Sequence, residues 1–252
     1  MLPNDHCCAA TKPARLTLAL KRVFDFVVSG LAIVVLLPFF IVVAAAIKLD
    51  SPGPVLFRQA RVGRSGHLFR IFKFRSMVDD ASRTGAALTV QDDPRITRLG
   101  AFLRDWKIDE LPQLFNVFVG SMSFVGPRPE VPEYMEFYSR EQRAIILSMR
   151  PGITDYAAVL FRDENKMLDC ESDPVNVYRY RIMPIKFALY DRYSREIGLL
   201  TDLRLIFGTV ALLISSKNLG WVEIDRDSLT AVLPDAVGCQ ETEGESLEQV
   251  RQ

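Results

Sequence analysis

The feature that most constrains this chain is an uncharged, apolar stretch that runs from Phe26 to Ile47. As a straight α-helix, its about 22 residues would extend roughly 33 Å, which is enough to cross the hydrocarbon core of a bilayer. Pro38 lies inside the stretch, where a proline removes one backbone hydrogen bond and clashes with the preceding turn. A helix that bends near Pro38 is therefore expected.

Basic residues flank this stretch on both sides. They are Lys12, Arg15, Lys21 and Arg22 before it and Lys48 after it. Because positive charge favours the cytoplasmic face, both ends are expected on that face, and residues 21–50 are predicted to form a re-entrant membrane helix. A helix that spans the bilayer fully is the main alternative. A signal peptide and a buried core helix fit the length and position of the stretch less well.

The distribution of charge says more about partners than its total does. The chain has 31 basic and 31 acidic residues, so it lacks the basic excess typical of a protein that binds nucleic acid. A group of cations follows the apolar stretch, at Arg58, Arg61, Arg64, Arg70, Lys73 and Arg75. This group favours binding of an anion, whereas the acidic residues that dominate beyond Glu223 are typical of a solvated tail.

Cysteine and histidine do not indicate a metal centre. The four cysteines, at positions 7, 8, 170 and 239, show no CxxC spacing, and two histidines cannot complete a conventional zinc site. The cysteine content fits a reducing compartment. Cys7 and Cys8 are expected to be unmodified thiols, with acylation next to the membrane segment as the alternative.

The rest of the sequence predicts an α+β fold that is mainly helical. Val55–Phe57 and His67–Phe74 read as extended segments around a turn at residues 63–66, which indicates a small hairpin. Apolar periodicity predicts helices over 95–104, 111–119, 133–149, 175–200 and 203–214. The last of these would lie either flat at a membrane interface or in the core. The expected order is a flexible N-terminus (1–20), the Pro-kinked membrane helix (21–50), a compact cytoplasmic domain (51–222) and an acidic, disordered tail (223–252).

Asp109 and Glu110 form an adjacent carboxylate pair at the start of the predicted helix 111–119. Taken alone, such a pair most often caps a helix. Cations surround it in the sequence, however, with Arg104 before it, Arg128 after it, and Lys73 further upstream. Carboxylates can attack an electrophile or bind a divalent cation, and arginines clamp phosphate oxygens, so the combination favours phosphoryl transfer.

A rigid loop carries one of these cations. Arg128 stands between Pro127 and Pro129, and each proline fixes its own φ and restricts the residue before it. Such a loop can hold an arginine in place. The chain contains neither a Walker loop nor a GxGxxG motif, so a helix start that cradles a nucleotide is not indicated.

Several motifs, in order, resemble the bacterial sugar transferase family, the monotopic polyprenyl-phosphate phosphoglycosyl transferases. The matching segments are Lys21-Arg22-Val23-Phe24-Asp25, Ser51-Pro52-Gly53-Pro54-Val55, Lys73-Phe74-Arg75-Ser76-Met77, Ile108-Asp109-Glu110-Leu111-Pro112-Gln113-Leu114, Met122-Ser123-Phe124-Val125-Gly126-Pro127-Arg128-Pro129 and Arg150-Pro151-Gly152-Ile153-Thr154. Together they extend over roughly residues 21–220, so the resemblance covers most of the chain and residues 51–222 would be its catalytic domain.

The resemblance implies an enzyme on the cytoplasmic face of the bacterial inner membrane. Asp109 would attack the β-phosphate of a UDP-sugar, release UMP and carry a covalent phospho-sugar, which polyprenyl (undecaprenyl) phosphate would then accept. Glu110 would either help Asp109 to hold Mg²⁺ or handle the acceptor proton. The product would start the synthesis of a polysaccharide or glycoconjugate, which downstream glycosyltransferases would extend.

The resemblance also implies a set of binding residues. The substrate-binding residues would be Lys73, Arg75, Arg104, Arg128, Pro127 and Pro129. Lys73 and Arg104 would neutralise the charge of the diphosphate, and Arg128 would contact the nucleotide. Pro38 matches the proline that breaks the family's re-entrant helix.

The chain departs from the family pattern at a few positions. Leu37 precedes Pro38 where serine is common, and Trp106-Lys107 precedes the carboxylate pair where Ser-Leu is common. Asp155-Tyr156 stands where Gly-Trp is frequent, which leaves the choice of sugar open. The chain is expected to be a small single-domain member without the N-terminal membrane bundle of larger relatives.

A protein of another class would use the same cations differently. A catalytically inactive relative, anchored to the membrane, could hold anionic lipid or act as a scaffold. The intact Asp109 and Glu110 favour the enzyme.

Overall fold

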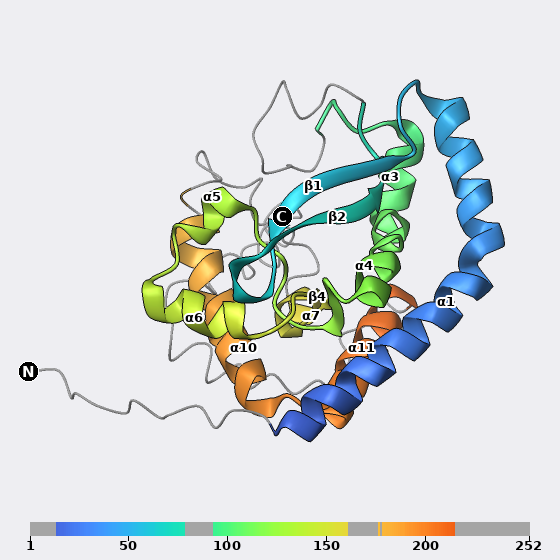
Figure 1. Cartoon of the computed structure of the whole chain (residues 1–252). Coiled ribbons are helices and arrows are strands. Elements are labelled where there is room, and N and C mark those ends of the chain that lie inside the picture. The colour runs from blue at the N-terminus through green and yellow to red at the C-terminus, as the bar shows by residue number, and fades with distance from the viewer. Residues whose placement is uncertain (1–13, 79–92, 161–175, 177, 215–252) are drawn as a thin grey trace, which may run out of the picture.

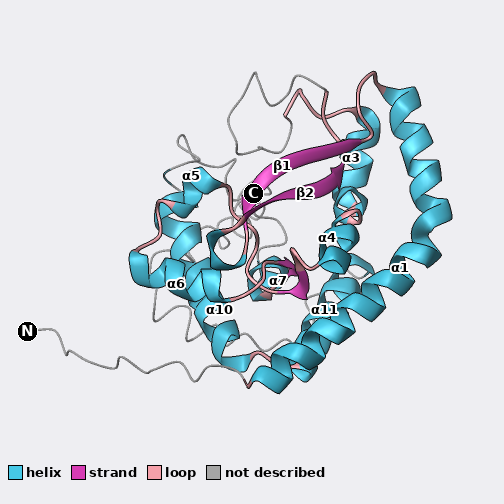
Figure 2. Cartoon of the chain, viewed as in Figure 1, coloured by secondary structure: helices cyan, strands magenta, loops and turns pink. Residues whose placement is uncertain are grey.

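The computed structural model describes residues 14–78, 93–160, 176 and 178–214. The acidic tail predicted for 223–252, most of the predicted flexible N-terminus and all four cysteines lie outside the described residues. Helices make up most of the described chain, and strands are confined to a hairpin and one short parallel pair (Figure 2). The predicted fold class, mainly helical with a small hairpin, is confirmed.

The apolar stretch lies in one long helix, α1 (Arg15–Asp50), which continues through Pro38. The helix begins six residues before the predicted boundary at residue 21, because leucine, alanine and arginine before Lys21 are good helix formers. Figure 1 shows α1 wrapping around the outside of the molecule instead of running straight through it. Its length and composition are enough to cross a membrane, and only 17% of the residues in its most apolar window are buried. A core helix of a soluble protein would be mostly buried, so that alternative is wrong.

Two different stripes of α1 face the protein. In the first half, buried Lys21, Asp25 and Ser29 follow one another at a spacing of one helical turn. In the second half, the buried side chains are Phe40, Val43 and Ile47. The most buried side chains are therefore polar in the first half of α1 and apolar in the second.

The predicted hairpin is confirmed. Strand β1 (Leu56–Val62) pairs antiparallel with β2 (Leu68–Phe74), in a register that places Leu56 opposite Phe74 and Val62 opposite Leu68. A short 3₁₀ turn, η1 (Arg64–Gly66), connects them. The first strand extends beyond the predicted Val55–Phe57 because the polar residues after Phe57 lie on a strand that is only partly covered.

The second sheet was not predicted. Strand β3 (Ser123–Val125) pairs in parallel with β4 (Gly152–Thr154). Each strand has only three residues, too short to leave an alternating pattern in the sequence.

Helices α3 (Arg98–Asp105) and α4 (Gln113–Val119) confirm two predictions with shifted starts. The Thr97 side chain caps α3 by accepting a hydrogen bond from the Gly100 amide, so α3 begins after Thr97 and not at residue 95. The remaining helices are α5 (Pro132–Met135), α6 (Arg140–Ser148), α7 (Tyr156–Leu160), α10 (Met183–Glu196) and α11 (Leu199–Ile214), with a π-helical segment η3 (Tyr178–Ile182) leading into α10.

Two predicted helices are interrupted. The helix expected over 133–149 is broken because Ser139 forms a capping box with Gln142 and starts α6 afresh. The helix expected over 175–200 ends at Glu196, and α11 starts after Gly198. Both predictions were based on apolar periodicity, which does not reveal a helix end or a new helix cap inside the pattern.

The main core lies among α6, α7, α10 and α11, and a second core forms where the latter half of α1 meets β2, α3 and α4. Helix α11 contributes to the core, as one of the two alternatives for residues 203–214 predicted. Leu205 is buried in the main core, whereas Phe207 and Val210 are exposed. The hairpin, α4 and the β3–β4 pair meet between these cores (Figure 1).

Candidate active site

The carboxylate pair lies in a 3₁₀ turn, η2 (Ile108–Glu110), between α3 and α4. Lys107 precedes the turn in a left-handed conformation with φ 55°, which redirects the chain after α3. The turn, and not the first turn of α4, therefore carries Asp109 and Glu110. Asp109 is buried with 7% of its surface exposed, and Glu110 is partly buried.

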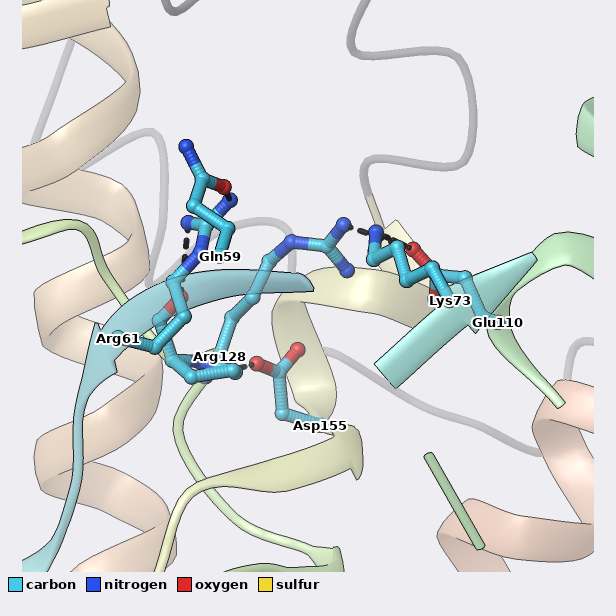
Figure 3. A network of polar contacts seen from close by, with 7 residues as sticks. Gln59, Arg61, Lys73, Glu110, Arg128 and Asp155 are labelled. Atoms are coloured by element: carbon cyan, nitrogen blue, oxygen red, sulfur yellow. Dashed lines mark hydrogen bonds and ion pairs between the residues drawn. The ribbon is translucent and has the colours of Figure 1, made fainter. Parts of the chain in front are cut away.

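Glu110 is held by two cations (Figure 3). Its Oε1 accepts hydrogen bonds from Lys73 Nζ at 2.6 Å and from Arg128 Nη2 at 3.1 Å. Burial acts to raise the pKa of Glu110, but Lys73, Arg128 and Lys107 outweigh it and hold that pKa well below its usual range. Glu110 is therefore a stable anion and a weak base.

Asp109 has a different environment from its neighbour. Its Oδ1 is buried and accepts no hydrogen bond from the described residues. Burial raises the pKa of Asp109, and the attraction of Lys73 and Arg104 only partly opposes it. A desolvated carboxylate oxygen without a hydrogen bond is a strong nucleophile once it is ionised.

The loop that carries Arg128 is anchored on both sides. Pro127 and Pro129 are buried, and the Pro127 carbonyl accepts a hydrogen bond from the Gly152 amide at 3.0 Å. The Arg128 amide donates to Asp155 Oδ2 at 3.1 Å. The backbone of Arg128 is thus fixed to the start of α7, and its side chain extends to Glu110 (Figure 3).

Not every predicted binding residue contacts the pair. Arg104 lies close enough to lower the pKa of Asp109, and its expected contact with the diphosphate stays a prediction. Arg75 is buried and donates instead to the Ser51 carbonyl at 2.6 Å and to Ser51 Oγ at 2.9 Å, beside the end of α1. The contacts of Arg75 thus anchor α1 to β2 and do not reach the carboxylates.

A small, open pocket adjoins Lys73 and Arg128, the two cations that contact Glu110. Its lining residues are Arg61, Ile71, Lys73, Gln113, Arg128, Pro129 and Gly152. Sequence reasoning did not select Arg61 or Gln113 as site residues, although Arg61 belongs to the cation group after the apolar stretch and Gln113 follows the carboxylate pair. Asp155 was noted only as a departure from a motif.

The carboxylate pair fits a magnesium ion as part of a larger set of ligands. The described residues contain no group of three or more histidine, cysteine or acidic side chains that could hold a metal. Magnesium, however, is often held by one or two carboxylates together with substrate phosphates. The free oxygen of Asp109 and the neighbouring Glu110 meet that requirement.

This arrangement can bind and attack a phosphate ester. Three cations, Lys73, Arg61 and Arg128, line the pocket. Asp109, whose Oδ1 accepts no hydrogen bond from the described residues, lies next to Glu110, which forms ion pairs with two of these cations. Cations that offset phosphate charge, together with a positioned nucleophile, are the main requirements of phosphoryl transfer.

Comparison with known proteins identifies relatives over most of the chain. The family model described as bacterial sugar transferase matches residues 16–216. The exopolysaccharide production protein PSS of Rhizobium leguminosarum bv. phaseoli is 42% identical over 208 residues, which cover 77% of this chain and 94% of the relative. The UDP-glucose:undecaprenyl-phosphate glucose-1-phosphate transferase of Caulobacter vibrioides is 38% identical over 200 residues, 79% of this chain and 71% of the relative.

A third relative is named for a different sugar. The UDP-N-acetylgalactosamine-undecaprenyl-phosphate N-acetylgalactosaminephosphotransferase of Aeromonas hydrophila is 42% identical over 162 residues, 62% of this chain and 38% of the relative. The names of the Caulobacter and Aeromonas relatives therefore differ in the sugar and agree on undecaprenyl phosphate.

Proposed function

The chain belongs to the bacterial sugar transferase family, and from this premise we propose that it transfers a sugar phosphate from a UDP-sugar to polyprenyl phosphate. Relatives that are named as enzymes carry out this type of transfer according to their names, with glucose or N-acetylgalactosamine as the sugar. The observation that carries the proposal is the contrast within the pair, in which Asp109 keeps a buried free oxygen while Glu110 is ion-paired.

In the first half-reaction, an Asp109 oxygen attacks the β-phosphorus of the UDP-sugar. The bond between that phosphorus and the oxygen bridging to the α-phosphate breaks, and UMP leaves with the electron pair. Asp109 then carries the sugar phosphate as an acyl phosphate. The lack of a hydrogen bond on Oδ1 supports this role, because no donor has to be displaced before the attack.

In the second half-reaction, an oxygen of polyprenyl phosphate attacks the same phosphorus. The bond to Asp109 breaks, the carboxylate is restored, and polyprenyl diphospho-sugar is released. A phosphate oxygen is already largely ionised near neutral pH, so this step needs no strong base. The low pKa of Glu110 agrees with a role in holding charge rather than in taking a proton.

The cations have distinct tasks in this scheme. Lys73 contacts Glu110 and influences the charge of Asp109, so it can neutralise the phosphate under attack. Arg104 approaches Asp109 from α3, and Arg128 reaches in from the opposite loop. A magnesium ion, held by Asp109, Glu110 and the substrate phosphates, would neutralise further charge on the diphosphate.

The reaction is proposed to occur at the cytoplasmic face of the bacterial inner membrane. Most of the apolar surface of α1 is exposed, and its polar half docks onto the domain that carries the pair. A re-entrant helix that bends near Pro38 would place both flanking basic segments on the side where nucleotide sugars are available. The product would then be available to downstream glycosyltransferases that build an exopolysaccharide or glycoconjugate.

A UMP-release screen across UDP-sugars tests this proposal. The full chain, in membranes or detergent with Mg²⁺ and polyprenyl phosphate, is expected to release UMP from one or a few donors. Omission of polyprenyl phosphate should reduce release to about one UMP per enzyme molecule. Release of UDP in place of UMP, or no release from any donor, would contradict the proposed transfer.

A further inference from the structure

Arg61 is a cation for which the proposed reaction has not yet supplied a role. It lies on β1, and its guanidinium donates to Gln59 Oε1 at 2.5 Å and to the Pro129 carbonyl at 3.1 Å. Both acceptors are neutral. The Nε atom is buried and has no hydrogen-bond partner among the described residues. A partly buried guanidinium whose hydrogen-bond acceptors are all neutral is costly, and it is expected mainly where a ligand supplies an anion in direct contact.

The described residues that line the pocket include three cations, Arg61, Lys73 and Arg128, and no carboxylate. Lys73 and Arg128 line the same pocket, and both already share the single carboxylate Glu110. Another nearby carboxylate, Glu130, is buried and accepts a hydrogen bond from the Tyr178 hydroxyl at 2.8 Å. Burial, and then repulsion from Arg128, lowers the pKa of Arg61, and the attraction of Glu130 and Glu110 offsets these effects only in part.

The order of the side chains separates two ends of the pocket. Figure 3 shows Arg128 between Arg61 on one side and Lys73 with Glu110 on the other. Asp109 belongs to the Lys73 end, because Lys73 is the main cation that acts on its charge. Arg61 therefore lies at the far end from the nucleophile. A diphosphate that presented one phosphorus to Asp109 would extend its second phosphate toward Arg61.

We propose that Arg61 is a phosphate-binding residue that holds the second phosphate of the donor, the one that leaves with the nucleotide. The proposal rests on the proposed function for the identity of the donor, and on the pocket geometry for the anion. Gln113, which is buried at the start of α4 and lines the same pocket, has an amide that can donate a further hydrogen bond to that phosphate.

Binding of inorganic pyrophosphate and of UMP to the full chain in detergent tests the role of Arg61 by calorimetry. Arg61→Met is expected to weaken both affinities at least tenfold, and to reduce their dependence on salt because one charge contact is lost. Arg61→Lys keeps the charge but loses the guanidinium fork, so it should fall between Arg61→Met and the wild type. Thermal melting must show that each variant is folded.

Arg58→Met is the matched control. Arg58 lies on the same strand, is exposed, and stacks over the Phe72 ring at 5.4 Å outside the pocket. Its replacement is expected to leave both affinities within twofold. Equal losses in the Arg58 and Arg61 variants would indicate a general charge effect and would overturn the proposal, as would an unchanged affinity in Arg61→Met.

Steady-state kinetics separate this inference from the proposed function. With Arg61→Met, the KM for the UDP-sugar should rise at least tenfold while the KM for polyprenyl phosphate stays unchanged. If the wild type releases UMP and the donor KM of Arg61→Met is unaltered, Arg61 has no such role and the proposed function stands. If the wild type releases no UMP, the proposed function fails, and pyrophosphate binding still decides whether Arg61 belongs to an anion site.

Discussion

At the scale of single residues, two neighbouring carboxylates acquire opposite properties from their surroundings. Asp109 and Glu110 are adjacent in the chain, yet burial raises the pKa of Asp109 while Lys73 and Arg128 overcome burial at Glu110 and lower its pKa. The difference arises because Oε1 of Glu110 receives both ion pairs, whereas Oδ1 of Asp109 receives no hydrogen bond from the part of the chain that the structure describes. One carboxylate is thus a fixed charge and the other a reactive group.

Asp109→Asn should separate activity from stability. The raised pKa means that the ionised carboxylate is less favourable in the folded than in the unfolded protein, so a neutral amide of the same shape should not destabilise the fold at neutral pH. UMP release should fall by about 10³-fold or more, because the nucleophile is absent. Thermal melting at pH 7 should give a Tm equal to or above that of the wild type.

Asp105→Asn is the control for this comparison, since Asp105 is an exposed acid at the end of α3. Its replacement should change neither activity nor Tm. A marked fall in the Tm of Asp109→Asn would mean that the Asp109 carboxylate is a stabilising group, contrary to its raised pKa.

The pH dependence of the reaction should report the ionisation of Asp109. Activity requires the ionised carboxylate, so it should be lost as pH falls through a pKa that lies above the ordinary value of 3.8. Lys73 is the main cation that lowers this pKa, and Lys73→Met should therefore move the acidic limb of the kcat/KM profile to higher pH. The exposed Arg70, on the same strand, provides the control Arg70→Met. An acidic limb that moved to lower pH in Lys73→Met would contradict this assignment.

The same two carboxylates affect stability with opposite signs. For Glu110, whose folded-state pKa is lowered, the contribution to stability is present above its ordinary value of 4.5 and is lost as pH falls below that value. For Asp109, whose folded-state pKa is raised, stability decreases as pH rises from 3.8 to that raised pKa and is constant above it.

At the scale of elements, the short β3–β4 pair positions the loop that carries Arg128. The strands approach so closely that a Cβ on Gly152 would lie 2.2 Å from the Gly126 nitrogen, and a Cβ on Gly126 would lie 2.2 Å from the Arg150 carbonyl oxygen. Both obstacles are backbone atoms, which cannot move aside as a flexible side chain can. Glycine is therefore required at positions 126 and 152 for the strands to approach this closely and to hold the Arg128 loop in place.

Gly152→Ala should force the two strands apart and misplace Arg128. We expect a loss of about 2–3 kcal/mol in the free energy of unfolding, at the upper end for overpacking, and a large loss of UMP release. Gly198→Ala is the control, because the nearest atom to its Cβ would be 3.7 Å away. That change should lie within about 0.5 kcal/mol of the wild type in denaturant unfolding. A Gly152→Ala variant with wild-type stability would show that the strand pair is not tightly packed.

The elements that could be predicted are those with long, local patterns. The hairpin, α3 and α4 followed from apolar periodicity and turn residues, and the apolar stretch identified α1. The β3–β4 pair could not be predicted, because its three-residue strands are brought together from distant parts of the chain. The interruption at Ser139 was missed although Ser139 and Gln142 have the spacing of a capping box, a signal that was present in the sequence.

The candidate site was predicted better than the elements that build it. Asp109, Glu110, Lys73 and Arg128 lie together, as the resemblance to the family implied. The sequence alone could not show that Arg75 lies outside the site. The contact of its guanidinium with Ser51 depends on how α1 packs against β2. The role of Asp155 as an acceptor for the Arg128 amide likewise depends on a loop contact that spacing does not reveal.

At the scale of the whole molecule, α1 is linked to the site through a buried polar chain. Lys21 forms an ion pair with Asp202 of α11, and the Tyr193 hydroxyl lies 2.7 Å from Asp202 Oδ1 and 3.2 Å from the Val125 carbonyl oxygen. Val125 ends β3, just before the loop that carries Arg128. Helix α1 and the loop that carries Arg128 are therefore held by one set of contacts.

The topology of α1 can be tested with single cysteines. In a variant whose native cysteines are replaced by serine, cysteines at Arg15 and at Arg64 should both react with a membrane-impermeant maleimide from the cytoplasmic side. Both positions are exposed and lie on either side of the apolar stretch. Pro38→Ala should move part of the Arg15 label to the opposite face, since an unbroken helix is long enough to span. Labels on opposite faces in the protein with Pro38 intact would show that α1 spans the bilayer.

The most direct test of the proposed mechanism is the mass of the intact enzyme after incubation with its UDP-sugar and Mg²⁺ in the absence of polyprenyl phosphate. We expect an adduct with the mass of the sugar phosphate, located on the peptide that contains Asp109 and removed when polyprenyl phosphate is added. A wild-type enzyme that turns over while forming no adduct, or an adduct that persists in Asp109→Asn, would contradict nucleophilic attack by Asp109.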